Sequence, residues 1–513
     1  MKNNRKYCQN LRFLNILYLG ILIFANQCNF PSLDRVPLLD LLALRSTICL
    51  ANPNDSICRS NLSTPDITSP TIAFTTPTNL ATNVPICTGT PCRARVVFQF
   101  SESMDTSIQP MGGFFTWNSL SFESTPVQIT YVWSTTTFPN DTFTMSFSWI
   151  WFPENQRIQI MSDAVNWKDL AGNTLNANIN LEFTTGYINQ SYAISDTEQI
   201  NCYDDTNLST CPATAATFPR QDGIMINTPL ARNYTAPTLV NVSDYITTDL
   251  VSGLVWTSCN LGQTGPTCGG APTIYSWANA MNACASYNSA NAGSGYANRT
   301  DWRLPTRWEV HSLPNFVTFG PSMNLTAFPN PTTNSVLTLS GTSSFNTVYL
   351  LQGNVGIMTT ALKSAASFIV RCVSSPTPIV TKNYQDLGDG TIRDMNSNLR
   401  WDKCTLGLSG PTCSIGTGTL LTWGAALNAC SAIGPEWRLP NYNELGSLID
   451  NRFSLPAIDP TFFPNTISAA YWTSTSAPGT TANAWTINMT NGTTQGTPKG
   501  GASARARCVR NHP

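Results

Sequence analysis

The chain has 513 residues, only 11% of them charged, and its 28 basic and 29 acidic side chains give a formal net charge of −1. An average soluble protein is about 25% charged, and because like charges do not cluster, the sequence excludes a nucleic-acid-binding protein. Sixteen cysteines accompany only two histidines, His311 and His512. Two histidines leave little room for a histidine-rich metal site or a Ser-His-Asp triad, so we expect no metal site and no cofactor.

The N-terminal segment has the pattern of a secretory signal. Four basic residues precede an apolar run over residues 13–25, namely Lys2, Arg5, Lys6 and Arg12. This run is too short to cross a bilayer as a helix. A basic stretch followed by a short apolar one predicts a signal peptide over residues 1–27. The alternative is a cytosolic protein in which the run forms a core helix.

The residues that follow, Ala25-Asn26-Gln27-Cys28, resemble the lipobox of bacterial lipoproteins. Gln27 is larger than the small residue usual there and Ala25 stands where Leu is commoner, departures that spirochaetal lipoproteins tolerate. The resemblance implies that Cys28 is lipidated and that residues 28–65 form a lipidated N-terminal segment. It further implies a lipid anchor in the outer membrane of the cell envelope, with exposure at the cell surface. Plain secretion or a periplasmic location is the alternative.

Residues 66–186 alternate apolar and polar side chains in runs separated by Pro, Gly and Asn, and so predict an antiparallel, all-β sandwich. One run holds Met145, Phe147, Trp149 and Trp151. Residues 97–105 (Val-Phe-Gln-Phe-Ser-Glu-Ser-Met-Asp) and residues 168–175 (Lys-Asp-Leu-Ala-Gly-Asn-Thr-Leu) resemble a bacterial Ig-like domain. The resemblance implies a spacer or display module without catalytic residues.

The C-terminal half contains an internal repeat. Residues 254–262 (Leu-Val-Trp-Thr-Ser-Cys-Asn-Leu-Gly) recur as residues 399–407 (Leu-Arg-Trp-Asp-Lys-Cys-Thr-Leu-Gly). The Trp-Arg-Leu-Pro of residues 302–305 recurs at 437–440, and Arg371-Cys372-Val373 recurs as Arg507-Cys508-Val509. The changing offset places an insertion in the first copy, near residues 286–299.

Fourteen of the 16 cysteines remain once Cys8 is assigned to the signal peptide and Cys28 to the lipid. Their order suggests five local disulfides, and the repeat suggests two more, so no thiol is left free. The expected pairs are Cys49–Cys58, Cys87–Cys92, Cys202–Cys211, Cys259–Cys268, Cys404–Cys413, Cys284–Cys372 and Cys430–Cys508. Because the order of cysteines does not prove connectivity, this pairing is a hypothesis.

Each copy predicts two helices and several strands. In the first copy one helical face is formed by Trp277, Ala280, Met281 and Cys284, with Ser276 at the N-cap position. In the second copy the same face is formed by Trp423, Ala426, Leu427 and Cys430, with Thr422 as the N-cap and Gly434 as the end. A second helix follows each Trp-Arg-Leu-Pro, where Thr306 with Glu309 and Asn441 with Glu444 have the spacing of capping boxes. Strands are predicted over residues 470–474, 484–488 and 504–509.

These residues, together with Tyr-Trp-Thr-Ser-Thr-Ser at 471–476 and the terminal Arg-Cys-Val-Arg, resemble the C-terminal domain of the Legionella collagen-like adhesin family. The resemblance covers residues 195–374 and 383–513. It implies two α+β domains similar to C-type lectins, each closed by a disulfide from the first helix to the last strand. In the first copy Leu337–Ser343 replaces the aromatic segment, which puts a ligand surface there in doubt.

Several side chains allow a chemical role and a structural one. Glu309 and Glu444 have the pattern of acid/base carboxylates, but a capping role is favoured. Arg303 and Arg438 are expected in buried ion pairs rather than against a ligand. Asp386, Asp389 and Asp394 lie around two glycines in a spacing that suggests Ca²⁺, but the 12-position Glu pattern of an EF-hand is missing and a turn is favoured.

The candidate ligand-binding residues lie in the second copy. The aromatic side chains expected to stack on sugar rings are Tyr471, Trp472 and Trp485. The basic side chains expected to attract sulfated glycans are Lys499, Arg505, Arg507 and Arg510. A core position for the aromatic residues and a solvated face for the basic ones are the alternatives.

We therefore expect a multidomain, non-catalytic surface lipoprotein: an Ig-like sandwich followed by two C-type-lectin-like domains that bind a host glycan or an extracellular-matrix protein. The alternative is a structural or envelope-assembly lipoprotein without a host ligand. Formylglycine-generating enzymes share a lectin-like fold but need reactive cysteines, and here every cysteine has an expected partner. The sequence does not determine the oligomeric state.

Overall fold

The computed structural model describes residues 66–89, 92–107, 129–147, 149–211, 217–375 and 380–512. The expected signal peptide, Cys28 and the expected Cys49–Cys58 pair lie outside these residues. Within the described ranges, no helix is long and apolar enough to cross a membrane. Contacts divide the chain into Met1–Thr68 and Ser69–Pro513, and the second unit holds every element described below.

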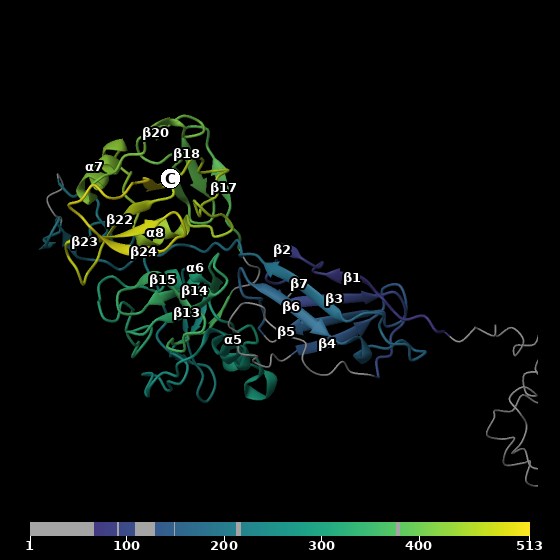
Figure 1. Ribbon diagram of the computed structural model, residues 1–513. Coiled ribbons are helices and arrows are strands. Elements are labelled where there is room, and N and C mark those ends of the chain that lie inside the picture. Colours follow the sequence, from purple (N-terminus) through teal and green to yellow (C-terminus); the bar gives the residue numbers. More distant parts are fainter. Residues whose placement is uncertain are drawn as a thin grey trace, which may run out of the picture. The chain divides into compact units, whose positions relative to one another are not determined.

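The first part of this unit is a sandwich of two sheets (Figure 1). One sheet has the order β1 (Ile72–Thr76), β3 (Arg95–Phe100), β5 (Thr142–Phe147), β4 (Ile129–Ser134), and the other the order β2 (Ala81–Val84), β7 (Ile179–Thr185), β6 (Arg157–Ser162). The alternation predicted from the sequence is confirmed, since every second side chain of β3, β6 and β7 is buried. Unlike the other pairs, β2 runs parallel to β7.

The strand predicted through Trp149 and Trp151 ends earlier, at Phe147. Ile150 adopts a positive φ of 63°, which ends the extended conformation. Both tryptophans are still buried, but against the first repeat: Trp149 Nε1 donates to Asn282 Oδ1 at 2.6 Å, and the Arg303 guanidinium lies 3.6 Å from the Trp151 ring centre. The alternating pattern therefore continues past the strand because a second domain covers these side chains.

The first repeat contains two sheets and two helices. The sheets have the orders β10 (Thr238–Leu239), β11 (Tyr245–Thr248), β12 (Val255–Thr257), β16 (Val373–Ser374) and β13 (Val336–Gly341), β14 (Thr347–Gln352), β15 (Ile357–Leu362). The helices are α5 (Trp277–Ser286) and α6 (Arg307–His311), and three short 3-10 helices between residues 287 and 298 occupy the predicted insertion. Ser276 is at the N-cap of α5, but its hydroxyl makes no capping bond.

The second repeat has the same plan. Its sheets have the orders β17 (Tyr384–Asp386), β18 (Thr391–Asp394), β19 (Leu399–Asp402), β25 (Val509–Asn511) and β22 (Ala470–Ser476), β23 (Asn483–Asn488), β24 (Thr494–Pro498), with the hairpin β20 (Leu408–Ser409), β21 (Ile415–Gly416). Its helices are α7 (Trp423–Ile433) and α8 (Tyr442–Ser447). The strands expected at 470–474 and 484–488 are confirmed, whereas the last strand begins only at Val509.

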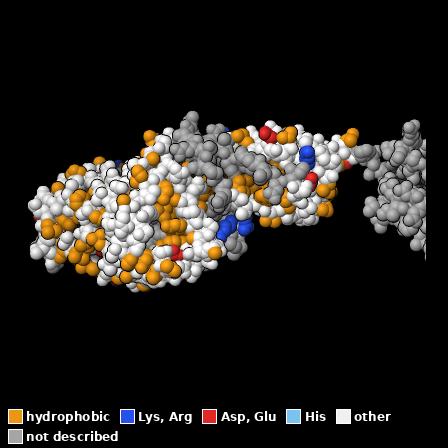
Figure 2. Space-filling model, turned by 90° about the horizontal axis from the view of Figure 1, so that it is seen from below, with side chains coloured by type: hydrophobic (Ala, Val, Ile, Leu, Met, Phe, Trp, Pro, Cys, Tyr) orange, Lys and Arg blue, Asp and Glu red, His pale blue; other side chains and the backbone are white. Residues whose placement is uncertain are grey.

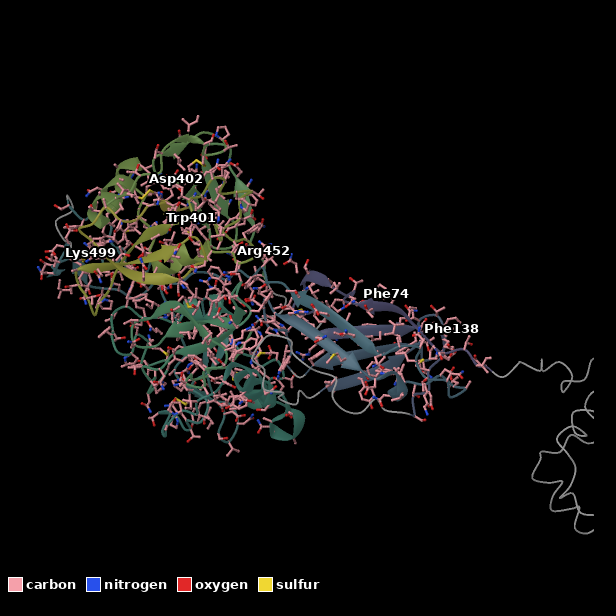
Figure 3. All side chains as sticks on the ribbon, in the orientation of Figure 1. Phe74, Phe138, Trp401, Asp402, Arg452 and Lys499 are labelled. Carbon is pink, nitrogen blue, oxygen red and sulfur yellow. A yellow bond between two sulfur atoms is a disulfide. The ribbon has the colours of Figure 1, made fainter. Side chains whose placement is uncertain are left out.

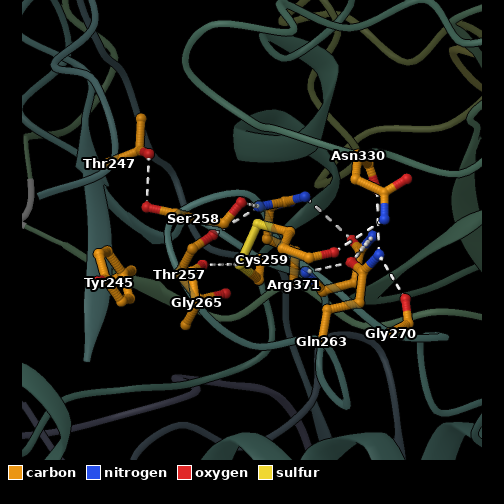
Figure 4. Close-up of a disulfide and its surroundings, with 12 residues drawn as sticks. Tyr245, Thr247, Thr257, Ser258, Cys259, Gln263, Gly265, Gly270, Asn330 and Arg371 are labelled. Carbon is orange, nitrogen blue, oxygen red and sulfur yellow. Dashed lines mark hydrogen bonds between the residues drawn. A yellow bond between two sulfur atoms is a disulfide. The ribbon is translucent and has the colours of Figure 1, made fainter. Parts of the chain in front are cut away.

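Six disulfides lie within the described residues, and they are the expected pairs: Cys87–Cys92, Cys202–Cys211, Cys259–Cys268, Cys284–Cys372, Cys404–Cys413 and Cys430–Cys508. Two of them join the first helix of a repeat to its C-terminal end. Figure 4 shows Cys259–Cys268 beside Arg371, whose guanidinium donates to the backbone oxygens of Thr257 and Ser258. Disulfide and arginine together fix the loop that follows β12.

Between sandwich and first repeat the chain forms a strap, defined as residues 195–211 and 217–229, which includes the short pair β8 (Cys202–Tyr203) and β9 (Leu208–Ser209). Phe218 stacks on Trp423 of α7 with ring centres 5.7 Å apart, and Arg220 Nη1 donates to the backbone oxygen of Trp437 at 2.7 Å. The sequence assigns these residues to the first repeat. Glu198 does contact that repeat through Asn315, but the strap from Gln199 onward packs against the second.

Candidate functional site

The three aromatic residues expected to bind a ligand are buried in the second repeat. Tyr471 and Trp472 are fully buried and Trp485 is 5% exposed. Every side chain of β22 after the first is buried, and α7 and α8 pack against this strand. Trp485 lies on β23, where Phe316 of the first repeat contacts it with ring centres 6.0 Å apart. The expectation that these rings form a sugar-stacking surface is therefore wrong, and the core interpretation is confirmed.

The expected basic patch is not a surface either. Lys499 and Arg507 are fully buried. Lys499 Nζ donates to the backbone oxygens of Asp204 and Thr481 at 2.9 and 2.8 Å, at the edge of the second repeat in Figure 3. Both cations are buried and donate to backbone oxygens, so they are unavailable to a polyanion.

Arg505 and Arg510 are the two expected basic residues that stay partly exposed. Arg510 pairs with Glu436 at 3.4 Å and lies over the ring of Trp437. Two separated arginines, one of them neutralised, do not make the strongly positive surface that the sequence suggests.

The buried Arg–Glu pairs have the structural role expected for them. Arg303 Nη1 and Nη2 donate to Glu309 Oε2 and Oε1 at 2.8 and 2.7 Å, and Arg438 pairs with Glu444 in the second repeat. Burial alone would raise the pKa of Glu309, but Arg303 holds it below its usual value. Both glutamates also complete capping boxes, so a capping role is confirmed in each repeat.

The described surface does contain a groove of about 690 Å³ on the second repeat. It lies between the β17–β18 turn, the loop closed by Cys404–Cys413 and the C-terminal end of α7. Its charged residues are Asp386, Asp389, Arg400, Asp402 and Lys403, and its apolar wall includes Leu408, Pro411, Ile433 and Trp437. In Figure 3 Asp402 lies next to Trp401, which is fully buried beneath this edge of the sheet.

The carboxylates at one side of the groove are paired with cations. Asp386 Oδ2 accepts from Lys403 Nζ at 2.7 Å, and Asp389 pairs with Arg400. The Lys403 ammonium lowers the pKa of Asp386, and the Thr391 hydroxyl together with Arg400 lowers that of Asp389. Burial, by contrast, raises the pKa of Asp402 to about 6. The groove is therefore nearly neutral overall, with donors and acceptors held in fixed positions.

The turn interpretation of Asp386, Asp389 and Asp394 is confirmed. Gly388 and Gly390 have φ values of 76° and 84°, which a side chain would disfavour. Asp386 Oδ1 accepts from the backbone N–H of Gly388 at 2.9 Å, and Asp394 Oδ1 accepts from that of Asn396 at 3.0 Å. These turns place two of the carboxylates on the groove.

No sequence pattern predicts a ligand role for Ile433, Trp437, Arg400 or Lys403. Ile433 lies three residues after buried Cys430 and so has the periodicity of a core residue, yet its side chain is 45% exposed. The groove arises because elements that are distant in sequence meet here, and no local pattern marks its residues.

Comparison with protein families agrees with this architecture. Residues 66–185 match the bacterial Ig-like domain, and residues 245–374 and 390–510 match the Lcl C-terminal domain. The strap lies outside all three matches. No curated protein matches the chain.

Among solved structures, the S-layer protein SbsC aligns with 11% identity and a TM-score of 0.17, over 37% of this chain and 23% of that one. The N-terminal part of SbsC aligns with 11% identity and a TM-score of 0.18, over 37% and 42%. This chain thus spans less than half the length of either, and at these TM-scores the likeness supports no statement about it. The family matches identify the chain as a multidomain, mostly β protein with one bacterial Ig-like domain and two Lcl C-terminal domains.

Proposed function

We propose that the chain is a non-catalytic binding protein of the bacterial cell surface, and that the groove of the second repeat is its ligand site. The observation that carries this proposal is the groove itself, where paired charges and an apolar wall line about 690 Å³ of accessible space. A site of this size fits a small polar ligand or the end of a longer one.

The chemistry of the groove favours a neutral glycan as the ligand. The carboxylates of the groove can accept hydrogen bonds from sugar hydroxyls, and Arg400 and Lys403 can donate hydrogen bonds to the hydroxyl oxygens. Trp437 and Ile433 provide an apolar surface for one face of a sugar ring. A different face of the molecule, drawn in Figure 2 as seen from below, also carries few charged side chains among neutral and hydrophobic ones. A sulfated glycan would need a cationic surface, and the buried Lys499 and Arg507 do not supply one.

The side chains that could act as nucleophiles or bases are held in structural contacts, which supports a non-catalytic role. The 12 described cysteines are all in disulfides. His311 is buried, and burial lowers its pKa to about 3. The two glutamates of the capping boxes are in buried ion pairs. A structural role in the envelope is the second candidate, favoured by the direct contacts of the sandwich with the first repeat through Trp149 and Trp151.

Two further features belong to the same proposal. The helix-to-C-terminus disulfides and the two small sheets of each repeat support a C-type-lectin-like α+β fold. A lipid on Cys28 would anchor the chain to the outer membrane, and protease shaving of intact cells tests whether the repeats face outward.

The test is a glycan array and matrix-protein binding screen with the whole chain. Ile433→Glu places a charge in the groove and should reduce binding at least tenfold. Val242→Glu is the matched control, since Val242 is an apolar side chain 99% exposed on the first repeat. Equal loss in both variants, or no binding to any probe, would rule out the groove as the ligand site.

A further inference from the structure

The two repeats bind upstream segments of the chain at equivalent positions. The offset of 135 that aligns the Trp-Arg-Leu-Pro motifs also aligns Ser340 with Thr475 and Gly341 with Ser476, and the offset of 136 that aligns Cys372 with Cys508 aligns Lys363 with Lys499. In both repeats these side chains or backbone groups contact residues that lie outside the two Lcl C-terminal matches. We call this set of groups the segment-binding site.

In the first repeat the bound segment belongs to the Ig-like domain. The Ser340 hydroxyl donates to Glu154 Oε2, and the backbone N–H of Gly341 donates to the backbone oxygen of Glu154 at 3.1 Å. The backbone oxygen of Gly341 accepts from the Tyr187 hydroxyl at 2.6 Å. Glu154 is 1% exposed, so its carboxyl group is fully inside the contact.

In the second repeat the bound segment is the strap. The Thr475 hydroxyl donates to Asp222 Oδ2 at 2.6 Å. The backbone N–H of Ser476 donates to Gln199 Oε1 at 2.9 Å, and its backbone oxygen accepts from Gln199 Nε2 at 2.8 Å. Asp222 and Gln199 are each 1% exposed. The same three groups of the repeat are therefore used as in the first copy.

A buried lysine completes each segment-binding site. Lys363 Nζ lies 4.3 Å from the ring centre of Trp277 and donates to Gln156 Oε1 of the Ig-like domain. Lys499 Nζ lies 4.4 Å from the ring centre of Trp423 and donates to the backbone oxygen of Asp204 in the strap. In each repeat the incoming segment thus supplies a carboxyl group to a hydroxyl and an oxygen to an ammonium.

The two incoming segments are unrelated in sequence. Glu154 and Gln156 are two residues apart in one segment, whereas Gln199, Asp204 and Asp222 are spread over the strap. Because different sequences meet the same four groups, the specificity lies in the repeat and not in the segment.

We propose that each of the two repeats carries a peptide-binding site for a segment with a buried carboxyl group, and that this chain occupies both sites itself. The Ig-like domain fills the site of the first repeat and the strap fills that of the second. This peptide site is separate from the groove proposed above as the ligand site, so either proposal can fail without the other.

The test removes residues 217–229 from the whole chain and adds them back as a synthetic peptide. Fluorescence anisotropy should show 1:1 binding of the labelled peptide. A peptide with Asp222→Ala should bind at least tenfold more weakly, whereas Asp222→Asn should stay within threefold because the amide oxygen still accepts from Thr475. Absence of binding to a folded deletion variant, or equal binding of the Asp222→Ala peptide, would overturn the proposal.

Point variants of the intact chain decide the matter if the deletion variant does not fold. Asp222→Ala should speed hydrogen exchange at residues 470–478 at least tenfold and leave residues 336–345 unchanged, while Glu154→Ala should do the reverse. The exposed acids Asp205 and Asp163 provide matched controls. Uniform changes in both repeats, or no local change, contradict a site of this kind.

Discussion

Arg303 and Arg438 show how this chain uses buried charge. Each is nearly inaccessible, and each forms an ion pair with a glutamate that caps the following helix. The spacing of Thr306 with Glu309 and of Asn441 with Glu444 predicts this arrangement, because a capping box is a contact within four residues. At the residue scale, local hydrogen bonds were therefore predictable from the sequence.

Removal of one partner of the buried Arg303–Glu309 ion pair should show how much an unpaired buried charge lowers the free energy of unfolding. Arg303→Ala leaves Glu309 unpaired in the core, and we expect a loss of about 3–5 kcal/mol in the free energy of unfolding. Arg157→Ala, which breaks the partly exposed pair with Glu182, should cost much less because solvent screens this pair. Urea unfolding of both variants measures the difference, and similar losses would contradict a structural role of the buried pair.

Glu154 makes the stability of the chain depend on pH. Burial raises its pKa to about 7, while Ser340 and Ile188 oppose the shift, and Glu309 and Arg303 act in opposite directions nearby. The native state then binds this proton more tightly than the unfolded state, whose pKa is about 4.5. Glu154 therefore destabilises the fold fully above pH 7, and this cost disappears as the pH falls toward 4.5.

Glu154→Gln should remove this dependence. Relative to the native chain, the variant should gain stability between pH 5 and pH 8, by about 3 kcal/mol at most. Denaturant titrations at several pH values measure the gain, with Asp163→Asn as an exposed control. A constant difference between variant and native chain across this range would show that Glu154 does not titrate there.

At the scale of elements, α6 and α8 show how two copies of one helix come to fit each other. The motif alignment makes His311 of α6 equivalent to Gly446 of α8, and the imidazole occupies the space that this glycine leaves open. The His311 ring stacks on Tyr442 with centres 4.3 Å apart, and its Nε2 lies 3.2 Å from the Tyr442 backbone oxygen. The repeats thus pair through a difference between their sequences.

A methyl group at Gly446 should separate these helices. Its Cβ would lie 1.9 Å from His311 Nε2, so Gly446→Ala should cost about 1–3 kcal/mol in the free energy of unfolding. The double variant with His311→Ala should recover part of this loss. Gly500→Ala, where a Cβ meets no atom within 4 Å, is the control. Additive effects of the two substitutions in urea unfolding would contradict direct contact.

These elements also show where prediction from the sequence ends. Helical periodicity predicted α5 and α7, and runs of aromatic and β-branched residues predicted β22 and β23, because these patterns are local. The burial of Trp485 on β23 does not follow from the pattern of its own strand, because Phe316 of the first repeat contacts it. The groove around Lys403 was missed for the same reason.

At the scale of the whole molecule, domain boundaries drawn from sequence similarity do not coincide with the packed units. The strap lies before the first repeat but packs against the second. The similarity between the copies could not reveal this, since the strap belongs to neither match.

A fragment cut between the repeats should therefore be incomplete. Residues 383–513 alone lack Phe218 against Trp423 and one of the two oxygens that Lys499 binds, that of Asp204, whereas residues 187–513 retain both contacts. We expect the shorter fragment to be cleaved by trypsin at least tenfold faster under native conditions. Equal protection of the two fragments would show that the second repeat does not need the strap.

The strap also sets an order of events during synthesis. Asp222 and the hydroxyl of Thr475 that binds it are 253 residues apart. At about 5–20 residues per second, roughly 10–50 s pass between the synthesis of the two. During this interval Phe218 and Asp222 lack their partners in the second repeat, and the first repeat is made before the strap can dock. A chain interrupted before its C-terminus would therefore leave this segment undocked and open to proteases, whereas the finished protein buries Asp222.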